Sequence, residues 1–180
     1  SGRSGLQVAL ARHADHVYLD LLPDDGQRAL ARRILLRLVQ FGEGRADTRR
    51  QQVVEALRQG MEGDGAFDTV LATLTANRLL TLGEETRRVD LAHEALIGGW
   101  PRLRGWIEER RAAEKADERA RLRKDDAGAG LLDAAELAEA QKYLASPDAA
   151  ELGVSQRVTA LVADSRASIE AAALEKERAA

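Results

Sequence analysis

The segment that most restricts the folds open to this chain is 87–106, in which a strand pattern changes into a helix pattern. Val89 and Leu91 alternate with polar residues, which predicts a strand with one buried face. His93 and Glu94 follow at the expected start of a helix, and Gly-Gly-Trp-Pro at 98–101 predicts a tight joint before another helix. We therefore expect the chain to turn from a strand into a helix at His93.

The position of His93 allows two roles. Unpaired N–H groups and the helix dipole at the start of a helix attract anions, and an imidazole there can donate a hydrogen bond to a phosphate. The histidine can also cap the helix or fill a partly polar pocket. Spacing alone favours the second, structural role.

The elements expected before this segment follow the order of a winged helix-turn-helix. Apolar residues recur at helical spacing over 6–21 and 27–41, and Asp24 or Asp25 is expected to cap the second helix. These helices are followed by a short strand at 49–54, helices at 55–59 and 67–77, and a β-hairpin of 79–82 and 88–91. The predicted fold class is mainly α: a winged helix-turn-helix with a small β-hairpin wing, followed by a helical arm or bundle.

The second half of the sequence predicts helices only. Pro101 suits the first turn of a helix over 101–124, whose later part is almost entirely Glu, Arg, Lys and Ala. A break at 125–130 separates it from an amphipathic helix at 131–144 and a last helix at 155–176. We therefore expect a winged-helix domain at 1–106, of which 1–5 are a linker or an expression scar, and a charged helix plus helical hairpin region at 107–180. Both ends are typical of a fragment of a longer protein.

The segment 89–97, VDLAHEALI, together with Trp100-Pro-Arg-Leu103 and Trp106, resembles the winged-helix segment of bacterial STAND NTPases. It is most similar to the novel STAND branch, whose members often carry a WD-repeat propeller downstream. Segments 8–15 and 32–39 also resemble this family. The resemblance spans residues 6–145 and is strongest over 87–106.

In the wider STAND class, which includes plant NLR receptors and apoptosome proteins, the matching motif is Met-His-Asp. Its histidine contacts the β-phosphate of bound ADP. This chain has Ala92, His93 and Glu94 at those positions, so the histidine matches and its two neighbours differ. The resemblance implies that His93 contacts the nucleotide phosphate in the parent protein and holds the switch closed.

Other residues of the segment are candidates for supporting roles. The candidates for orienting His93, or for a seam between domains, are Asp90, Glu94, Arg87 and Arg88. Trp100 and Trp106 stand six residues apart and do not share one helical face. We expect them to fix the helix to the winged domain, the alternative being exposed anchors for a partner.

The resemblance also implies a cofactor and partners for the parent protein. This chain has no Gly-rich phosphate-binding loop ending in Lys-Ser/Thr, so the chain alone is expected to bind no cofactor and not to be an enzyme. ADP or ATP with Mg is implied for the parent, an ATPase-type switch. The implied partners are an upstream nucleotide-binding core and a downstream WD-repeat propeller of the same polypeptide, with homo-oligomers on activation.

Composition excludes several other classes. The sequence has no cysteine, which removes disulfides, thiol catalysis and cysteine-ligated zinc. His13 and His16 stand three residues apart without an obvious third ligand, so we predict no metal site. No long apolar run and no signal peptide are visible. The chain is therefore expected to be soluble and cytoplasmic, without a membrane partner.

Two other functions are alternatives to the nucleotide switch. A winged helix that binds DNA should carry basic residues on its third helix and wing, yet 68–77 has no Lys or Arg and the turn at 83–86 holds two glutamates. Basic and acidic side chains nearly balance over 1–106, and Arg45, Arg49 and Arg50 form at most a small basic patch. DNA binding is therefore disfavoured. A protein-interaction scaffold or oligomerisation module is the stronger alternative.

Overall fold

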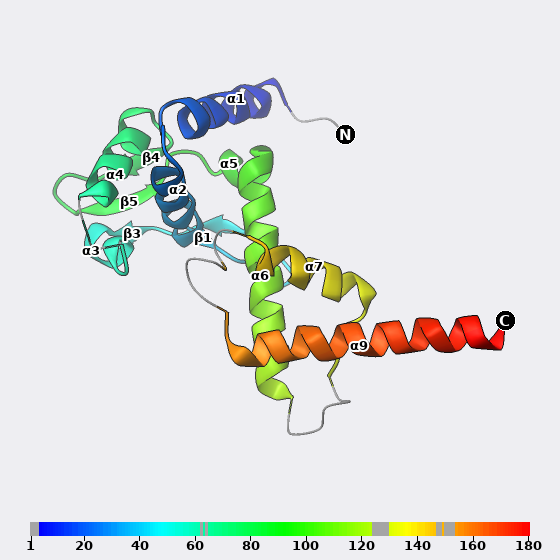
Figure 1. Cartoon of the computed structure of the whole chain (residues 1–180). Helices are drawn as coiled ribbons and strands as arrows, with labels where there is room; N and C mark the ends of the chain where they lie inside the picture. Colours follow the sequence, from blue (N-terminus) through cyan, green and yellow to red (C-terminus); the bar gives the residue numbers. More distant parts are fainter. Residues whose placement is uncertain (1–3, 62, 64, 124–129, 147–148, 150–153) are drawn as a thin grey trace. The chain divides into compact units, whose positions relative to one another are not determined.

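A computed structural model of the chain describes residues 4–61, 63, 65–123, 130–146, 149 and 154–180. These residues are mainly helical, with two small antiparallel sheets, which confirms the prediction of a mainly α fold with a small β-hairpin (Figure 1). The chain divides into two units, Ser1–Ile107 and Glu108–Ala180, and the division falls within helix α6 (Pro101–Leu122). Each unit is described separately below.

Side-chain caps fix the starts of the first two helices. Ser4 Oγ accepts from the backbone N–H of Gln7 at 3.2 Å, and Gln7 Oε1 accepts from the backbone N–H of Ser4 at 3.1 Å, which starts α1 (Gly5–Asp20). Asp24 Oδ1 accepts from the backbone N–H of Gln27 at 2.7 Å, which starts α2 (Asp25–Arg37). Both helices therefore begin close to the predicted positions.

The prediction that the second helix continues to residue 41 is wrong. The helix ends at Arg37, and the next residues form β1 (Val39–Gln40), which pairs antiparallel with β2 (Thr48–Arg49). The carbonyl oxygen of Leu38 accepts from the backbone N–H of Arg50 at 2.8 Å. These partners lie across the 42–47 loop, so the helical spacing of 27–41 could not reveal them.

A three-stranded antiparallel sheet forms the other β-structure of the first unit. Its strand order is β3-β5-β4, where β3 is Gln52–Val53, β4 is Leu80–Leu82 and β5 is Arg88–Leu91. Two helices, α3 (Val54–Arg58) and α4 (Ala66–Ala76), lie between β3 and β4 in the chain. The predicted hairpin of 79–82 and 88–91 is confirmed, and the single strand predicted at 49–54 is divided between β2 and β3.

The core of the first unit lies where α2 packs against α4, α4 against β4, and α1 against α5 (Ala95–Gly99). Its fully buried side chains include Ile34, Leu35, Leu74, Leu91 and Trp100. These residues come from α2, α4, β5 and the connection before α6, so one core holds the helices and the central strand together.

The joint predicted at 98–101 is only partly present. Gly98 and Gly99 lie inside α5, and only Trp100, with φ −100° and ψ 104°, leaves the helical conformation before α6 begins at Pro101. A Cβ atom at Gly99 would lie 3.1 Å from Cγ of Gln7 in α1. This glycine therefore serves the close approach of α1 and α5 rather than a turn.

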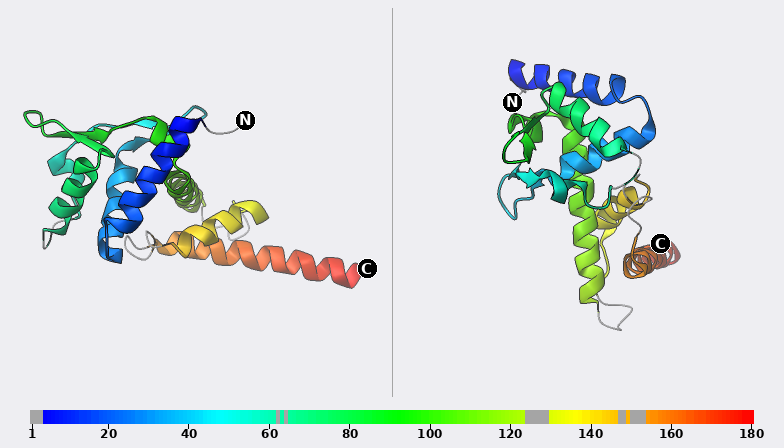
Figure 2. Two further views of the ribbon diagram at one scale, coloured as in Figure 1. Left: turned by 90° about the horizontal axis from the view of Figure 1, so that it is seen from above. Right: turned by 90° about the vertical axis from the view of Figure 1, so that its left-hand side faces the viewer.

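The second unit consists of the later part of α6 with α7 (Ala134–Leu144) and α9 (Gln156–Ala179). Its buried apolar residues are Ala116, Ala120, Leu132, Leu137, Ala140, Val158, Leu161 and Val162. The last part of α9 leaves this cluster: residues 170–180 are exposed, and in Figure 2 the red end of α9 extends past α7, drawn in yellow. The predicted helices at 131–144 and 155–176 are thus confirmed with shifted ends, while most of the predicted break at 125–130 lies outside the described residues.

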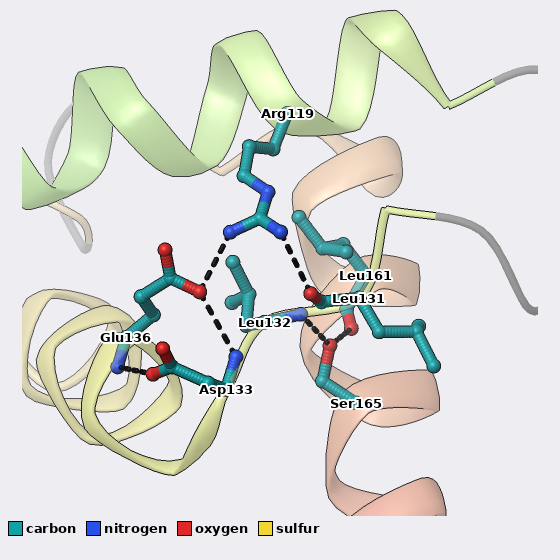
Figure 3. Close-up of polar contacts among 7 residues, drawn as sticks. All are labelled: Arg119, Leu131, Leu132, Asp133, Glu136, Leu161 and Ser165. Carbon is teal, nitrogen blue, oxygen red and sulfur yellow. Dashed lines mark hydrogen bonds and ion pairs between the residues drawn. The ribbon is translucent and has the colours of Figure 1, made fainter.

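Polar contacts tie the segment before α7 to both neighbouring helices of this unit (Figure 3). Arg119 Nη1 lies 2.6 Å from Oε2 of Glu136, and Arg119 Nη2 donates to the carbonyl oxygen of Leu131 at 2.8 Å. The backbone N–H of Leu132 donates to the buried Ser165 Oγ at 3.0 Å. Ser165 therefore satisfies a backbone donor that lies in the apolar cluster.

Across the described residues, every helix is either too short or too polar to cross a lipid bilayer.

Candidate functional site around His93

His93 lies in the short connection between β5 and α5, and the strand side of this connection is firmly held. Leu91 pairs with Leu80 across the sheet and is fully buried. The next residue, Ala92, donates its backbone N–H to the carbonyl oxygen of Leu79 at 2.9 Å. The backbone is therefore fixed up to the residue before His93.

The helix side of the connection is also anchored. The carbonyl oxygen of His93 accepts from the backbone N–H of Leu96 at 3.2 Å, and that of Glu94 accepts from Ile97 at 3.0 Å. Leu96 and Ile97 are both buried in the core. The structure thus confirms that His93 stands at a strand-to-helix junction, with its backbone held on both sides.

The His93 side chain itself points to no partner within the described chain. The residue is exposed, and its imidazole forms no hydrogen bond or ion pair with any residue that the structure describes. Such a ring can donate to an incoming anion without first breaking a protein contact. The following helix, α5, has only five residues, so its dipole can add little to that attraction.

Neither Asp90 nor Glu94 contacts His93. Asp90 Oδ1 accepts from the backbone N–H of Leu91 at 2.8 Å, and Asp90 Oδ2 lies 3.9 Å from Nη1 of Arg49. Glu94 is exposed at the N-cap position of α5, where its side chain makes no capping bond. A role for these carboxylates in orienting the imidazole therefore has no support in the geometry.

Arg87 and Arg88 lie at the opposite end of β5 from His93. Arg87 adopts a left-handed backbone conformation (φ 55°), and its Nη2 lies 3.7 Å from Oε1 of Glu55. Since a strand advances about 3.3 Å per residue, Arg88 and His93 are separated by up to ~16 Å. These arginines do not orient His93, although they remain exposed at the turn of the hairpin.

Arg49 is a site residue that the sequence alone does not place beside His93. Its Nη1 donates to the carbonyl oxygen of Leu91 at 3.3 Å, two residues before His93. In the sequence, Arg49 is one of several arginines in a polar stretch, and the register between β3 and β5 that brings it here cannot be read from spacing.

Trp100 and Trp106 belong to the core of the first unit. Trp100 is fully buried, its Nε1 donates to Asp15 Oδ1 at 2.8 Å, and its ring lies 5.5 Å from that of Trp106 in an edge-to-face arrangement. Tyr18 packs against both indoles, and this burial raises the pKa of Tyr18 above 10.0, although the nearby Arg102 guanidinium acts in the opposite direction. The role of exposed anchors does not fit the burial of the two indoles.

The first unit also contains an open groove of about 450 Å³ beside α4. Most of the residues that line it are apolar or small, and two are charged; the lining residues are Val54, Asp68, Leu71, Ala72, Thr75, Ala76, Leu82 and Arg87. Arg58 Nη2 lies 2.8 Å from Asp68 Oδ1, and this contact lowers the pKa of Asp68 below 3.8. A surface of this kind suits an apolar protein segment better than a phosphate backbone.

The two remaining histidines have partners of their own. His13 Nε2 donates to the carbonyl oxygen of Asn77 at 2.6 Å, and His16 Nδ1 lies 2.8 Å from Asp20 Oδ2. In the part of the chain that the structure describes, no three potential metal-binding side chains gather in one place.

Together, the fold and the site define a class of protein: a mainly helical domain in which a small antiparallel sheet presents an exposed histidine on an anchored connection. Residues 2–127 match the family described as Novel STAND NTPase 1. The match covers more than half of the chain, and the protein therefore belongs to this family. Neither a curated protein nor a solved structure matches the chain.

Proposed function

We propose that this chain is a regulatory module of a STAND signal-transduction NTPase, and that residues 1–106 form its winged-helix domain. The family match supports the first part of the proposal. Apart from the small β1-β2 pair inserted after α2, the elements follow the order α2, β3, α3, α4, β4, β5, with β5 central in the sheet. This order supports the second part, since a winged helix has the same order of helices and hairpin.

In this proposal, His93 is a latch that holds the ADP-bound, inactive state. Its imidazole donates to the β-phosphate of ADP bound in the nucleotide-binding core of the parent protein. The observation that carries the proposal is the exposed ring without a described partner on a backbone fixed from Leu91 to Leu96. The latch works only because His93 binds the closed state better than the open state, so exchange of ADP for ATP releases the module.

The proposal extends to the surroundings of the module. The upstream core binds ADP or ATP with Mg, and the chain itself contributes no catalytic group. Arg87, Arg88, Asp90 and Glu94 lie at exposed or half-buried positions of the hairpin and its exit, where they can form the seam with another domain. A downstream WD-repeat propeller, homo-oligomers on activation and a cytoplasmic location complete the proposal.

The experiment compares ADP release from the parent polypeptide with and without the histidine. A hydrogen bond to a charged group contributes about 1.5–3 kcal/mol. His93→Ala should therefore release ADP roughly 10- to 150-fold faster. His16→Ala is the matched control, because His16 is also exposed but pairs with Asp20 in α1. Equal retention of ADP by the His93→Ala variant and the parent would contradict the latch.

The second candidate function is a protein-interaction scaffold or oligomerisation module. The apolar groove beside α4 favours it, because such a surface can bury the side chains of a protein partner. An unchanged rate of ADP release in His93→Ala would favour the protein-interaction scaffold over the latch. DNA binding is disfavoured again here, because most residues that line the groove beside α4 are apolar or small, and Arg87 is the only basic residue among them.

A further inference from the structure

We propose that Arg49 is a second phosphate-binding residue, which acts together with His93 on the diphosphate of the bound nucleotide. This inference rests on the proposed function, because it assigns a further ligand to the same site. It concerns a residue that lies in β2, far from His93 in the sequence.

The pairing of β3 with β5 brings Arg49 to the His93 connection. Gln52 pairs with Val89 and Val53 with Arg88, in antiparallel register. If this register is continued by three residues beyond Gln52, Arg49 lies opposite Ala92, the residue directly before His93. The hydrogen bond from Arg49 Nη1 to the carbonyl oxygen of Leu91, at 3.3 Å, shows that the two segments stay close beyond the paired residues.

Two contacts hold the Arg49 guanidinium while leaving part of it available. Its Nη1 donates to Leu91 and lies 3.9 Å from the Asp90 carboxylate. Neither Nε nor Nη2 has a partner among the residues that the structure describes, and the side chain is 40% exposed. An arginine carries five N–H donors in a planar fork, so one edge can be fixed by the protein and the other can bind a phosphate.

Arg49 and His93 complement each other chemically. Arg49 is bound to the backbone of Leu91, which is two residues before His93. Two residues of chain span at most about 7 Å, so the Leu91 backbone lies within about that distance of the His93 backbone. A diphosphate carries several negative oxygens, of which one imidazole can contact only one or two. The positive guanidinium partly offsets the half-buried carboxylate of Asp90 and the exposed carboxylate of Glu94 nearby.

The test measures the rate of ADP release from the parent polypeptide in Arg49→Gln, with Arg50→Gln as the matched control. The control removes the same charge one residue further along, where the side chain of an extended segment points to the other side. Arg49→Gln should release ADP roughly 10-fold faster or more. Arg50→Gln should change the rate less than about twofold. Release of AMP, which lacks the β-phosphate, should be equal in all variants.

A second substitution at Arg49 separates loss of phosphate binding from loss of stability. Arg49→Lys keeps the charge but loses the planar fork, and it should release ADP at a rate between those of the parent and Arg49→Gln. If Arg49→Gln lowers the melting temperature of the protein, the Arg49→Lys rate decides: a rate equal to that of the parent overturns the inference.

The outcomes separate this inference from the proposed function. If His93→Ala accelerates ADP release and Arg49→Gln behaves like Arg50→Gln, His93 is a latch and Arg49 is not a phosphate ligand. If His93→Ala has no effect, the proposed function itself fails, and the inference fails with it. Faster release in both His93→Ala and Arg49→Gln, with Arg50→Gln unchanged, supports both.

Discussion

The hydrogen bond between Trp100 and Asp15 provides a quantitative test of how the first unit is held together. The Trp100 indole is fully buried, and its Nε1 donates to Asp15 Oδ1 at 2.8 Å. Asp15 also pairs with Arg102 at 3.1 Å, and the Asp15 side chain is 41% exposed. The perturbation is Trp100→Phe, which keeps an aromatic ring in the core but removes the only N–H of the indole.

Trp100→Phe lowers the free energy of unfolding in two ways, by loss of the hydrogen bond and by loss of buried ring atoms. A hydrogen bond to a charged group contributes about 1.5–3 kcal/mol, and the lower end applies because Asp15 stays partly hydrated and paired with Arg102. The smaller ring also removes about three buried ring atoms, a loss of about 2 kcal/mol at about 0.8 kcal/mol per buried group. Trp100→Phe should therefore lower the free energy of unfolding by about 3.5 kcal/mol.

The matched control is Trp106→Phe. Trp106 is also buried, at 6% exposure, but its indole donates no hydrogen bond to any residue that the structure describes. It should lose only the ring contribution, about 2 kcal/mol. Both tryptophans of the chain lie in the first unit, so urea unfolding followed by the fluorescence of the remaining indole reports on that unit in each variant.

A double-mutant cycle isolates the hydrogen bond from the packing. Trp100→Phe, Asp15→Ala and the double variant should show a coupling energy of about 1.5 kcal/mol. If the two single effects add within about 0.5 kcal/mol, the bond between Trp100 and Asp15 does not contribute to stability and the reasoning is refuted.

Two further predictions concern other parts of the chain. Ser165→Ala should lower the free energy of unfolding by about 1–3 kcal/mol, measured by urea unfolding and circular dichroism, because the Leu132 N–H then lacks its acceptor. Ser168 is exposed on the same helix, and Ser168→Ala should lower the free energy of unfolding by less than about 0.5 kcal/mol. Equal effects of the two substitutions would contradict this prediction. Asp68 has a pKa below 3.8, so its carboxylate stabilises the fold above pH 3.8, and this stabilisation is lost as the pH falls through the lowered pKa. Arg58→Gln removes the hydrogen bond to this carboxylate and should return the pKa of Asp68 toward 3.8 in an NMR titration. An unchanged pKa of Asp68 in Arg58→Gln would contradict the role of Arg58.

The sequence predicted the elements whose signals are local. Helical spacing and a capping residue lie within a few positions of each other, and the start of α2 at Asp24 followed from them. Helical spacing also predicted α1 from residue 6, one residue after its observed start, but it did not predict the cap at Ser4. The hairpin of β4 and β5 also has a local signal, since both strands alternate and only a short turn separates them. The junction at His93 is where the strand pattern ends, so its position could be predicted from the sequence as well.

Features that depend on distant pairing were not visible in the sequence. The helix predicted over 27–41 ends at Arg37 because the following residues pair with Thr48 and Arg49, across a loop. The position of Arg49 near His93 depends on the register of β3 against β5, which joins residues that are far apart in the chain.

The amino-acid sequence by itself determined the helical class, the hairpin and the histidine at its exit, because each rests on side chains that are neighbours along the chain. Only the tertiary structure decided what surrounds that histidine. It placed Arg49 at the site, directed the Asp90 carboxylate to Arg49 and the Leu91 N–H instead of His93, and buried Trp100 and Trp106 in the core. The physical reason is that strand register and side-chain burial are set by contacts between segments that are distant in the chain. Such contacts cannot be predicted from local sequence patterns.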